Sequence, residues 1–177
     1  MVASNKDRIY VALYARGGKE VDTYHWALIV GPKNEAEGRR GTRYHVRQRL
    51  DPRNPGQYRW EYEALEIPLT QTSMLLARVL IGKVTDGARL ARILQQVPLV
   101  QADPNWTCRI WVRDAIAALA NDNKSLGTSV TDWPKVQESA KAYVAKKRQQ
   151  RRYDGSGNWK PGTVPAYDLL TEQEVVE

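Results

Sequence analysis

Phenylalanine is absent from this chain of 177 residues, cysteine occurs once and histidine occurs twice. A single cysteine cannot form an internal disulfide, which excludes a disulfide-stapled fold and favours a reducing compartment. The two histidines and the cysteine show none of the close spacings of structural zinc sites, so we expect neither a metal nor another cofactor. Any nucleophile and base of the Cys/His type must come from Cys108, His25 and His45.

Long apolar runs are also lacking. The longest candidate, residues 74–82, is interrupted by Arg78 and is far shorter than the roughly 20 residues that cross a bilayer. The first residues lack the basic start and apolar stretch of a secretion signal. We therefore expect an intracellular, cytoplasmic protein without a membrane span. The sequence also contains no phosphate-binding, dinucleotide-binding or serine-hydrolase motif, which leaves nucleotide and serine-hydrolase chemistry without support.

The positive charge, formally +7, is unevenly distributed. Residues 39–59 contain seven arginines and one aspartate, and the run KKRQQRR at 146–152 adds five cations. By contrast, residues 168–177 contain four acidic residues and no basic one. Two basic regions favour an anionic ligand or an acidic partner, and the acidic end could fold back on either region.

The first half of the chain has the pattern of β-strands. Short segments rich in β-branched and aromatic residues predict strands at 8–15, 24–31, 42–48, 58–65 and 76–84. The connections are too short for crossover helices, so neighbouring strands should pair antiparallel.

The second half has the pattern of helices, predicted at 86–97, at 103–122 and from residue 132 into the basic run. In the second helix Asp103 is the expected cap and Pro104 the first helical residue. We predict an α+β fold, with an antiparallel sheet of about five strands packed against about three helices. Residues 1–153 would form one domain, and the turn-rich tail 154–177 would pack on or near it.

Cys108 falls in the second turn of its predicted helix, where unpaired backbone N–H groups favour a thiolate over a thiol. A nearby histidine would complete a nucleophile–base pair for attack on a carbonyl. The alternative is an inert core residue, because Cys108 shares a helical face with Trp111 and Val112, and free cysteines are usually buried.

The two histidines carry similar alternatives. His25 alternates with Ala27 along its strand, which also fits a buried ring bonded to a backbone carbonyl. His45 lies between Arg43 and Arg47 on one strand face, which also fits a solvated polar surface. If the two strands pair and present both rings on one side, His45 would orient His25, and the arginines would favour an anionic substrate.

Two resemblances add to this pattern. The strand YHWALIVG resembles the histidine strand of circularly permuted NlpC/P60 proteins, the papain-like group that includes lecithin:retinol acyltransferase. That resemblance implies His25 as base, His45 as the residue that orients it, and Cys108 as the nucleophile. The whole chain is similar to a widespread set of small filamentous-fungal proteins of unknown function, through YVALYARGG, TYHWALIVGPK, GTRYHV, DPNWTCRIWV, LGTSV and YDLL.

The leading hypothesis is a cysteine-dependent hydrolase or acyl transferase acting on an amide, ester or thioester. Arg43, Arg47, Trp26 and Trp106 would contact the substrate, and Trp106 or the backbone N–H of Cys108 would hold the oxyanion. The second hypothesis is a non-catalytic binding module of the same scaffold. Its basic surface would bind an acidic partner or, less favoured, a nucleic acid, with the run 146–152 on phosphates and Trp159 or Tyr153 stacking on bases.

A third hypothesis is an assembly protein whose acidic tail docks on the basic hairpin of a neighbour. The run 146–152 also fits a solvated helix end, where basic residues suit the negative pole of a helix. The sequence leaves the oligomeric state open.

Overall fold

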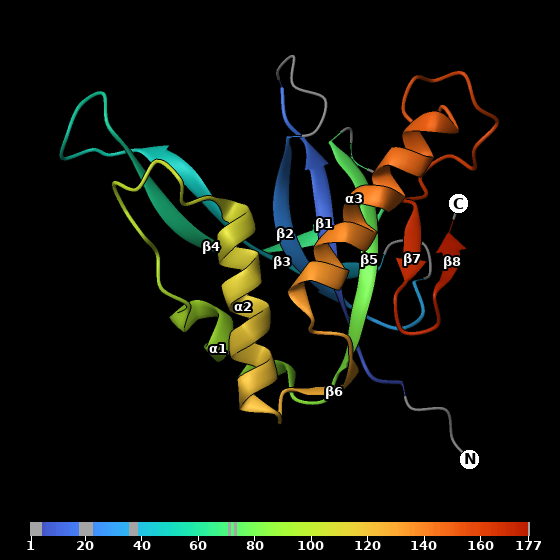
Figure 1. Ribbon diagram of the computed structural model, residues 1–177, viewed down its shortest axis with the longest axis horizontal. Coiled ribbons are helices and arrows are strands. Elements are labelled where there is room, and N and C mark those ends of the chain that lie inside the picture. The colour runs from blue at the N-terminus through green and yellow to red at the C-terminus, as the bar shows by residue number, and fades with distance from the viewer. Residues whose placement is uncertain (1–4, 18–22, 36–38, 71, 73, 177) are drawn as a thin grey trace.

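The computed structural model describes residues 5–17, 23–35, 39–70, 72 and 74–176 (Figure 1). Its elements are β1 (Arg8–Ala15), β2 (Tyr24–Gly31), β3 (Arg40–Leu50), β4 (Tyr58–Pro68), β5 (Leu75–Val84), α1 (Gly87–Gln96), α2 (Cys108–Asp122), β6 (Leu126–Ser129), α3 (Trp133–Gln149), β7 (Ala166–Asp168) and β8 (Gln173–Val176). The predicted α+β class is confirmed, with most strand residues in the N-terminal half.

The strands form one sheet in the order β4-β3-β2-β1-β5-β7-β8, and β6 pairs with β5 off this path. Neighbours pair antiparallel except β5 and β7, which are parallel. The sheet is therefore mixed and has eight strands, where the sequence predicted about five antiparallel ones. The three additional strands are only three or four residues long, which is too short to show a period.

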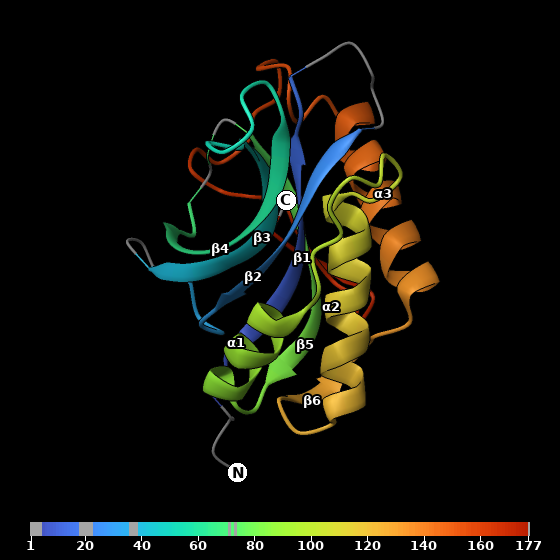
Figure 2. The same ribbon diagram turned by 90° about the vertical axis from the view of Figure 1, so that its left-hand side faces the viewer.

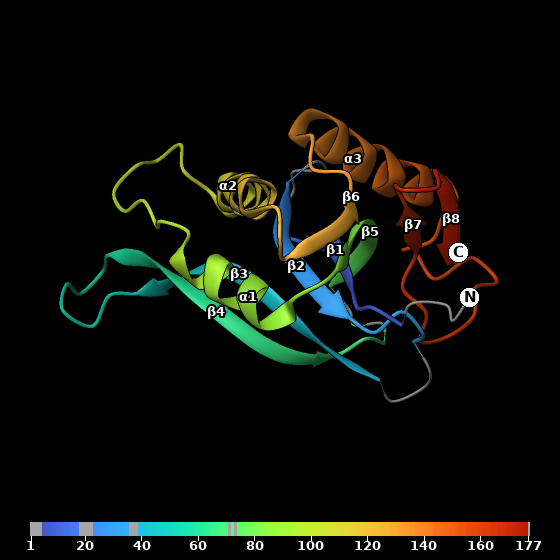
Figure 3. The same ribbon diagram turned by 90° about the horizontal axis from the view of Figure 1, so that it is seen from below.

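The two faces of the sheet are covered differently. Side chains of all three helices pack with alternate residues of β1 and β2, such as Leu13 and Trp26, in the larger core cluster. The intervening residues, such as Tyr14 and Ala27, belong to a second cluster that contains no helix residue. Figure 3 shows the helices on one side of the sheet. A one-residue step along a strand therefore moves a side chain from the helix face to the opposite face.

Helix α2 begins later than the sequence predicts. Asp103 does not cap it; its side chain accepts a hydrogen bond from the backbone N–H of Asn105 in a separate turn. Thr107 is extended and forms the N-cap, so Cys108 is the first helical residue instead of lying in the second turn. The other two helices are capped by aspartates, because Asp86 and Asp132 each accept a hydrogen bond from the backbone N–H three residues on.

The outer edge of β4 is bonded by a side chain at one point. The Gln101 side chain accepts a hydrogen bond from the backbone N–H of Trp60 at 2.8 Å and donates one to its carbonyl at 2.9 Å. Gln101 lies in the connection between α1 and α2, which Figure 2 shows passing beside the sheet. These two bonds hold that connection against the strand.

The acidic tail folds back on the basic end of α3. Glu174 of β8 pairs with Lys147, which is 1% exposed, and accepts a hydrogen bond from Tyr143 at 2.6 Å. Arg152 is also buried and donates to the carbonyl of Thr163. The expected solvated helix end is therefore correct only in part: Lys147 and Arg152 are interior to the fold, whereas Lys146, Gln149, Gln150 and Arg151 are exposed.

The Glu174→Gln substitution should lower the free energy of unfolding by roughly 3 kcal/mol, because it leaves the buried Lys147 ammonium without its carboxylate. Urea unfolding at neutral pH measures this change. The matched control is Glu172→Gln, since Glu172 pairs with the exposed Lys135 and should lose less than about 1 kcal/mol. Equal losses in the two variants would contradict the buried pairing.

Candidate functional site

Cys108 lies at the start of α2 with its side chain only 1% exposed. Its Sγ accepts a hydrogen bond from Nη2 of Arg16 at 3.1 Å and one from the backbone N–H of Trp26 at 3.4 Å. The side chain of the N-cap, Thr107, makes no capping hydrogen bond. The first-turn N–H groups therefore keep their partial positive charge near the sulfur.

A pocket of about 240 Å³ opens beside this sulfur. Its lining comes from the residue after β1, the start of β2, the start of α2 and the middle of α3: Arg16, Thr23, Tyr24, Trp26, Thr107, Cys108, Arg109 and Lys141. Three of these side chains are cationic and none of them is acidic. The pocket is therefore suited to an anionic group held close to the thiol.

The two histidines and Glu63 of β4 form a hydrogen-bonded network, the histidine network. Nε2 of His25 lies 2.7 Å from Nδ1 of His45, and Nε2 of His45 lies 2.7 Å from Oε2 of Glu63. Arg47 donates to the other carboxylate oxygen at 2.5 Å. Although partial burial opposes it, the hydrogen bonds from His45 and Arg47 lower the pKa of Glu63, so its carboxylate is ionised.

The histidine network fixes the tautomer of each imidazole ring. Burial, followed by His45 and two nearby arginines, lowers the pKa of His25 to about 3. Burial also lowers the pKa of His45, against the opposing hydrogen bond with Glu63. Both rings are thus neutral at pH 7. Because an ionised carboxylate only accepts, His45 carries its proton on Nε2 and accepts on Nδ1; His25 donates from Nε2 and keeps a lone pair on Nδ1.

The histidine network and Cys108 lie on opposite faces of the sheet. The ring of His25 contacts Tyr14, a member of the helix-free cluster, at a centroid distance of 6.0 Å. Cys108 belongs to the helix-side cluster and meets the strand at the backbone of Trp26. Within the described ranges no hydrogen bond joins His25 to Cys108. The expected pairing of the two histidines is present, and the thiol has Arg16 as its side-chain partner.

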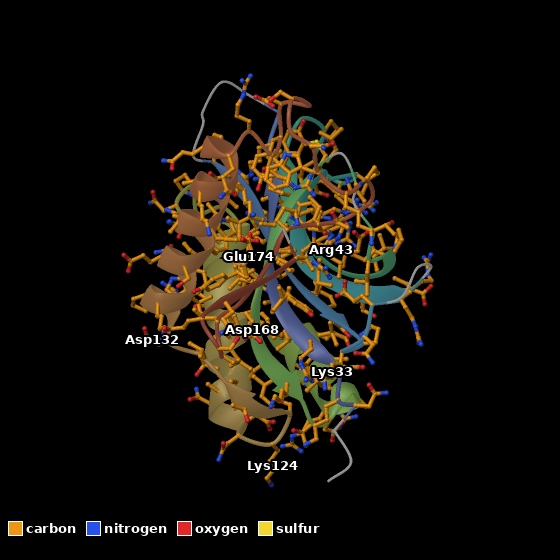
Figure 4. All side chains as sticks on the ribbon, turned by 90° about the vertical axis from the view of Figure 1, so that its right-hand side faces the viewer. Lys33, Arg43, Lys124, Asp132, Asp168 and Glu174 are labelled. Carbon is orange, nitrogen blue, oxygen red and sulfur yellow. The ribbon has the colours of Figure 1, made fainter. Side chains whose placement is uncertain are left out.

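The expected substrate-contacting residues divide in the same way. Trp26 lines the pocket beside Cys108. Arg43 and Arg47 accompany His45 and approach Glu63, with Arg43 over the ring of Tyr14 at 5.5 Å. Figure 4 shows Arg43 on the side away from α3.

Trp106 is 5% exposed and packs edge-on against Trp60 at 5.2 Å. Its Nε1 is buried and has no hydrogen-bond partner in the part of the chain that the structure describes. Trp106 does not line the pocket beside Cys108. Its position is that of a core residue of the helix face.

Sequence reasoning missed the carboxylate Glu63 and six pocket residues: Arg16, Thr23, Tyr24, Thr107, Arg109 and Lys141. Glu63 had a usable signal, because it is the direct antiparallel partner of His45 in the β3–β4 hairpin. The hairpin register would have placed the two side chains on one face. The pocket residues come from four separate segments, and no sequence spacing links them.

Comparison with known proteins places the chain in a family but gives it no activity. A model of a family of unknown function, DUF6914, matches residues 6–176, and the protein belongs to that family. No curated protein and no solved structure matches the chain.

The described residues show neither a metal-binding group nor a membrane-spanning helix. These residues include no group of three or more His, Cys, Asp or Glu side chains placed to hold a metal ion. None of the helices there combines the length and the apolar character that a membrane span requires.

Nitrogen-15 NMR of the imidazole rings should show His25 neutral at pH 5, with its proton on Nε2. A histidine of ordinary pKa, about 6.5, would be mostly protonated at that pH. Glu63→Gln is the control, since an amide both donates and accepts and no longer fixes the tautomer of His45. A protonated His25 at pH 5 would contradict the hydrogen bonds described for the histidine network.

The same shifts set the sign of the pH dependence of stability. The pKa of each histidine is lower in the folded protein than in the unfolded chain, so the unfolded chain binds protons first as the pH falls below about 6.5. The contribution of these rings to the free energy of unfolding is therefore present above that pH and decreases as the pH falls further, for His25 down to about pH 3.

Proposed function

We propose that this protein is a cysteine-dependent hydrolase or acyl transferase with Cys108 as its nucleophile. The observation that carries the proposal is the pair of donors on Sγ, the Arg16 guanidinium and the Trp26 backbone N–H, at the first residue of a helix and beside a cation-lined pocket. Both groups donate hydrogen bonds to the sulfur, and the thiolate of a cysteine is the attacking species in such reactions.

In the proposed reaction the thiolate attacks the carbonyl carbon of an acyl donor. A bond forms between carbon and Sγ, and the bond from that carbon to the leaving group breaks. Among the described residues no histidine or carboxyl group bonds to Sγ or lines the pocket. The pocket therefore offers neither of these groups to protonate the leaving group. This favours a thioester donor, because a thiolate departs without a proton, whereas an amine must be protonated as it leaves.

The acyl group then passes from Cys108 to water or to a second nucleophile, which loses its proton to solvent. The N–H groups at the start of α2 are available to the oxyanion that forms at each step. Arg109 and Lys141 would bind an anionic group on the donor, and Trp26 would contact its apolar part. A pocket of about 240 Å³ accommodates only the acyl end of a larger molecule.

The alternative of a nucleic-acid or acidic-partner module has less support. Of the basic run, Lys147 and Arg152 are buried, and both lie over the ring of Trp159, at 5.4 and 5.1 Å. That ring was the expected stacking surface for bases, and it is covered by cations of its own chain. The acidic tail docks on α3 of the same chain, which also leaves the assembly hypothesis with less support.

Alkylation of Cys108 by iodoacetamide at pH 7, followed by mass spectrometry, tests the nucleophile. Arg16→Met should slow alkylation by roughly tenfold or more, since a hydrogen bond to a charged group contributes about 1.5–3 kcal/mol. His25→Gln should leave the rate within about twofold of wild type, because the ring faces away from the sulfur. Lys141→Met should also leave it unchanged, because iodoacetamide is neutral and Lys141 makes no hydrogen bond to Sγ in the described structure.

A thioester probe with a carboxylate on its acyl chain tests the transfer step. The expected product is a covalent acyl adduct on Cys108, formed more slowly in Lys141→Met than in wild type. Loss of alkylation in His25→Gln, with Arg16→Met unaffected, would instead identify His25 as the activating base. A thiol that reacts only after unfolding would show Cys108 to be an inert core residue.

A further inference from the structure

A second cavity, of about 380 Å³, lies away from the Cys108 pocket. Its lining comes from the segments that follow β2 and β4, from the middle of β5, from the segment before β7 and from the end of β8: Glu35, Arg39, Leu69, Thr70, Arg78, Lys160, Pro161, Gly162, Thr163, Val164 and Val176. This lining contains both apolar and charged residues. Such a combination is typical of pockets that hold a small molecule by an apolar body and a polar head.

The charged side is built around a buried arginine. Arg78 of β5 is 2% exposed and lies over the ring of Tyr10 at 4.9 Å. Nη1 and Nη2 donate to the two oxygens of Glu35 at 2.6 and 2.7 Å. Its Nε is also buried and has no partner among the residues that the structure places. The fork of donors on a guanidinium suits a planar or tetrahedral oxyanion, and here the Glu35 carboxylate occupies it.

The charge balance of the cavity favours an anion. Arg39, Arg78 and Lys160 line it against a single carboxylate, that of Glu35. Neither Arg39 nor Lys160 forms an ion pair within the described ranges, and Thr70 and Thr163 add hydroxyl groups to the wall. The Glu35 carboxylate therefore occupies the position on Arg78 that a ligand oxyanion would take, and a net positive charge remains around it.

We propose that this cavity binds a small molecule with an apolar body and a phosphate or carboxylate head group, whose oxyanion replaces the Glu35 carboxylate on Arg78. Arg39 and Lys160 bind the remaining negative charge, while Leu69, Val164 and Val176 contact the body. This site is separate from the Cys108 pocket and does not depend on the proposed acyl transfer.

Isothermal titration of the full chain with phenyl phosphate and with benzoate tests the site, with benzyl alcohol as the uncharged analogue. Phenyl phosphate should bind and benzyl alcohol should not, and the affinity for benzoate compared with phenyl phosphate identifies the preferred head group. Lys160→Gln should weaken binding at least threefold. The matched control, Lys33→Gln, removes the same charge from an exposed residue outside the cavity and should change the affinity less than twofold (Figure 4).

Glu35→Gln distinguishes a ligand site from a purely structural ion pair. This substitution removes the competitor and leaves the Arg78 guanidinium without its carboxylate, so the melting temperature should fall and phenyl phosphate should restore it at constant ionic strength. The affinity for phenyl phosphate should rise at least fivefold. If phenyl phosphate neither binds this variant more tightly nor restores its stability, the proposal is wrong. If the variant does not fold, equal affinities in Lys160→Gln and Lys33→Gln overturn the proposal, and weaker binding in Lys160→Gln alone supports it.

Discussion

Strand β1 is buried from Arg8 to Tyr14, with a hydrogen-bonded strand on each edge and packed side chains on each face. A strand in this position has no solvent side, so its apolar side chains alternate between two cores. The larger core is closed by the helices, and the smaller one by residues that follow β4 and precede β7. The reactive side chains follow the same division, with the thiol of Cys108 on the helix face and the histidine network on the opposite face.

Local patterns were sufficient to predict the long strands, α1 and α3. Alternation and β-branched residues marked β1 to β5, and aspartate caps marked the two helices, because these signals lie within the element itself. The late start of α2 could not be predicted in this way, since Asp103 satisfies a turn just as well as a helix cap. The pairing of β7 with β5 is a contact between distant segments, and no local signal encodes it.

The candidate site divides along the same line. The contact between His25 and His45 followed from two neighbouring strands and their alternation, and Glu63 could have been added from the hairpin register. The position of Cys108 relative to these rings depends on which face the helix covers. Sequence alternation shows that His25 and Trp26 point to opposite sides, but it does not show on which side α2 packs. The contact of Arg16 with Cys108 was missed as well, since it joins residues that are 92 positions apart.

The double hydrogen bond between Gln101 and Trp60 has a consequence for how these molecules behave in a crowded solution. An exposed edge strand offers free N–H and C=O groups to a strand from another molecule, and such pairing begins aggregation. At Trp60 a side-chain amide already occupies both groups, as a peptide of an added strand would. A loop residue thus blocks the addition of a strand at Trp60, and the charged residues Arg59 and Glu61 stand on either side of that point.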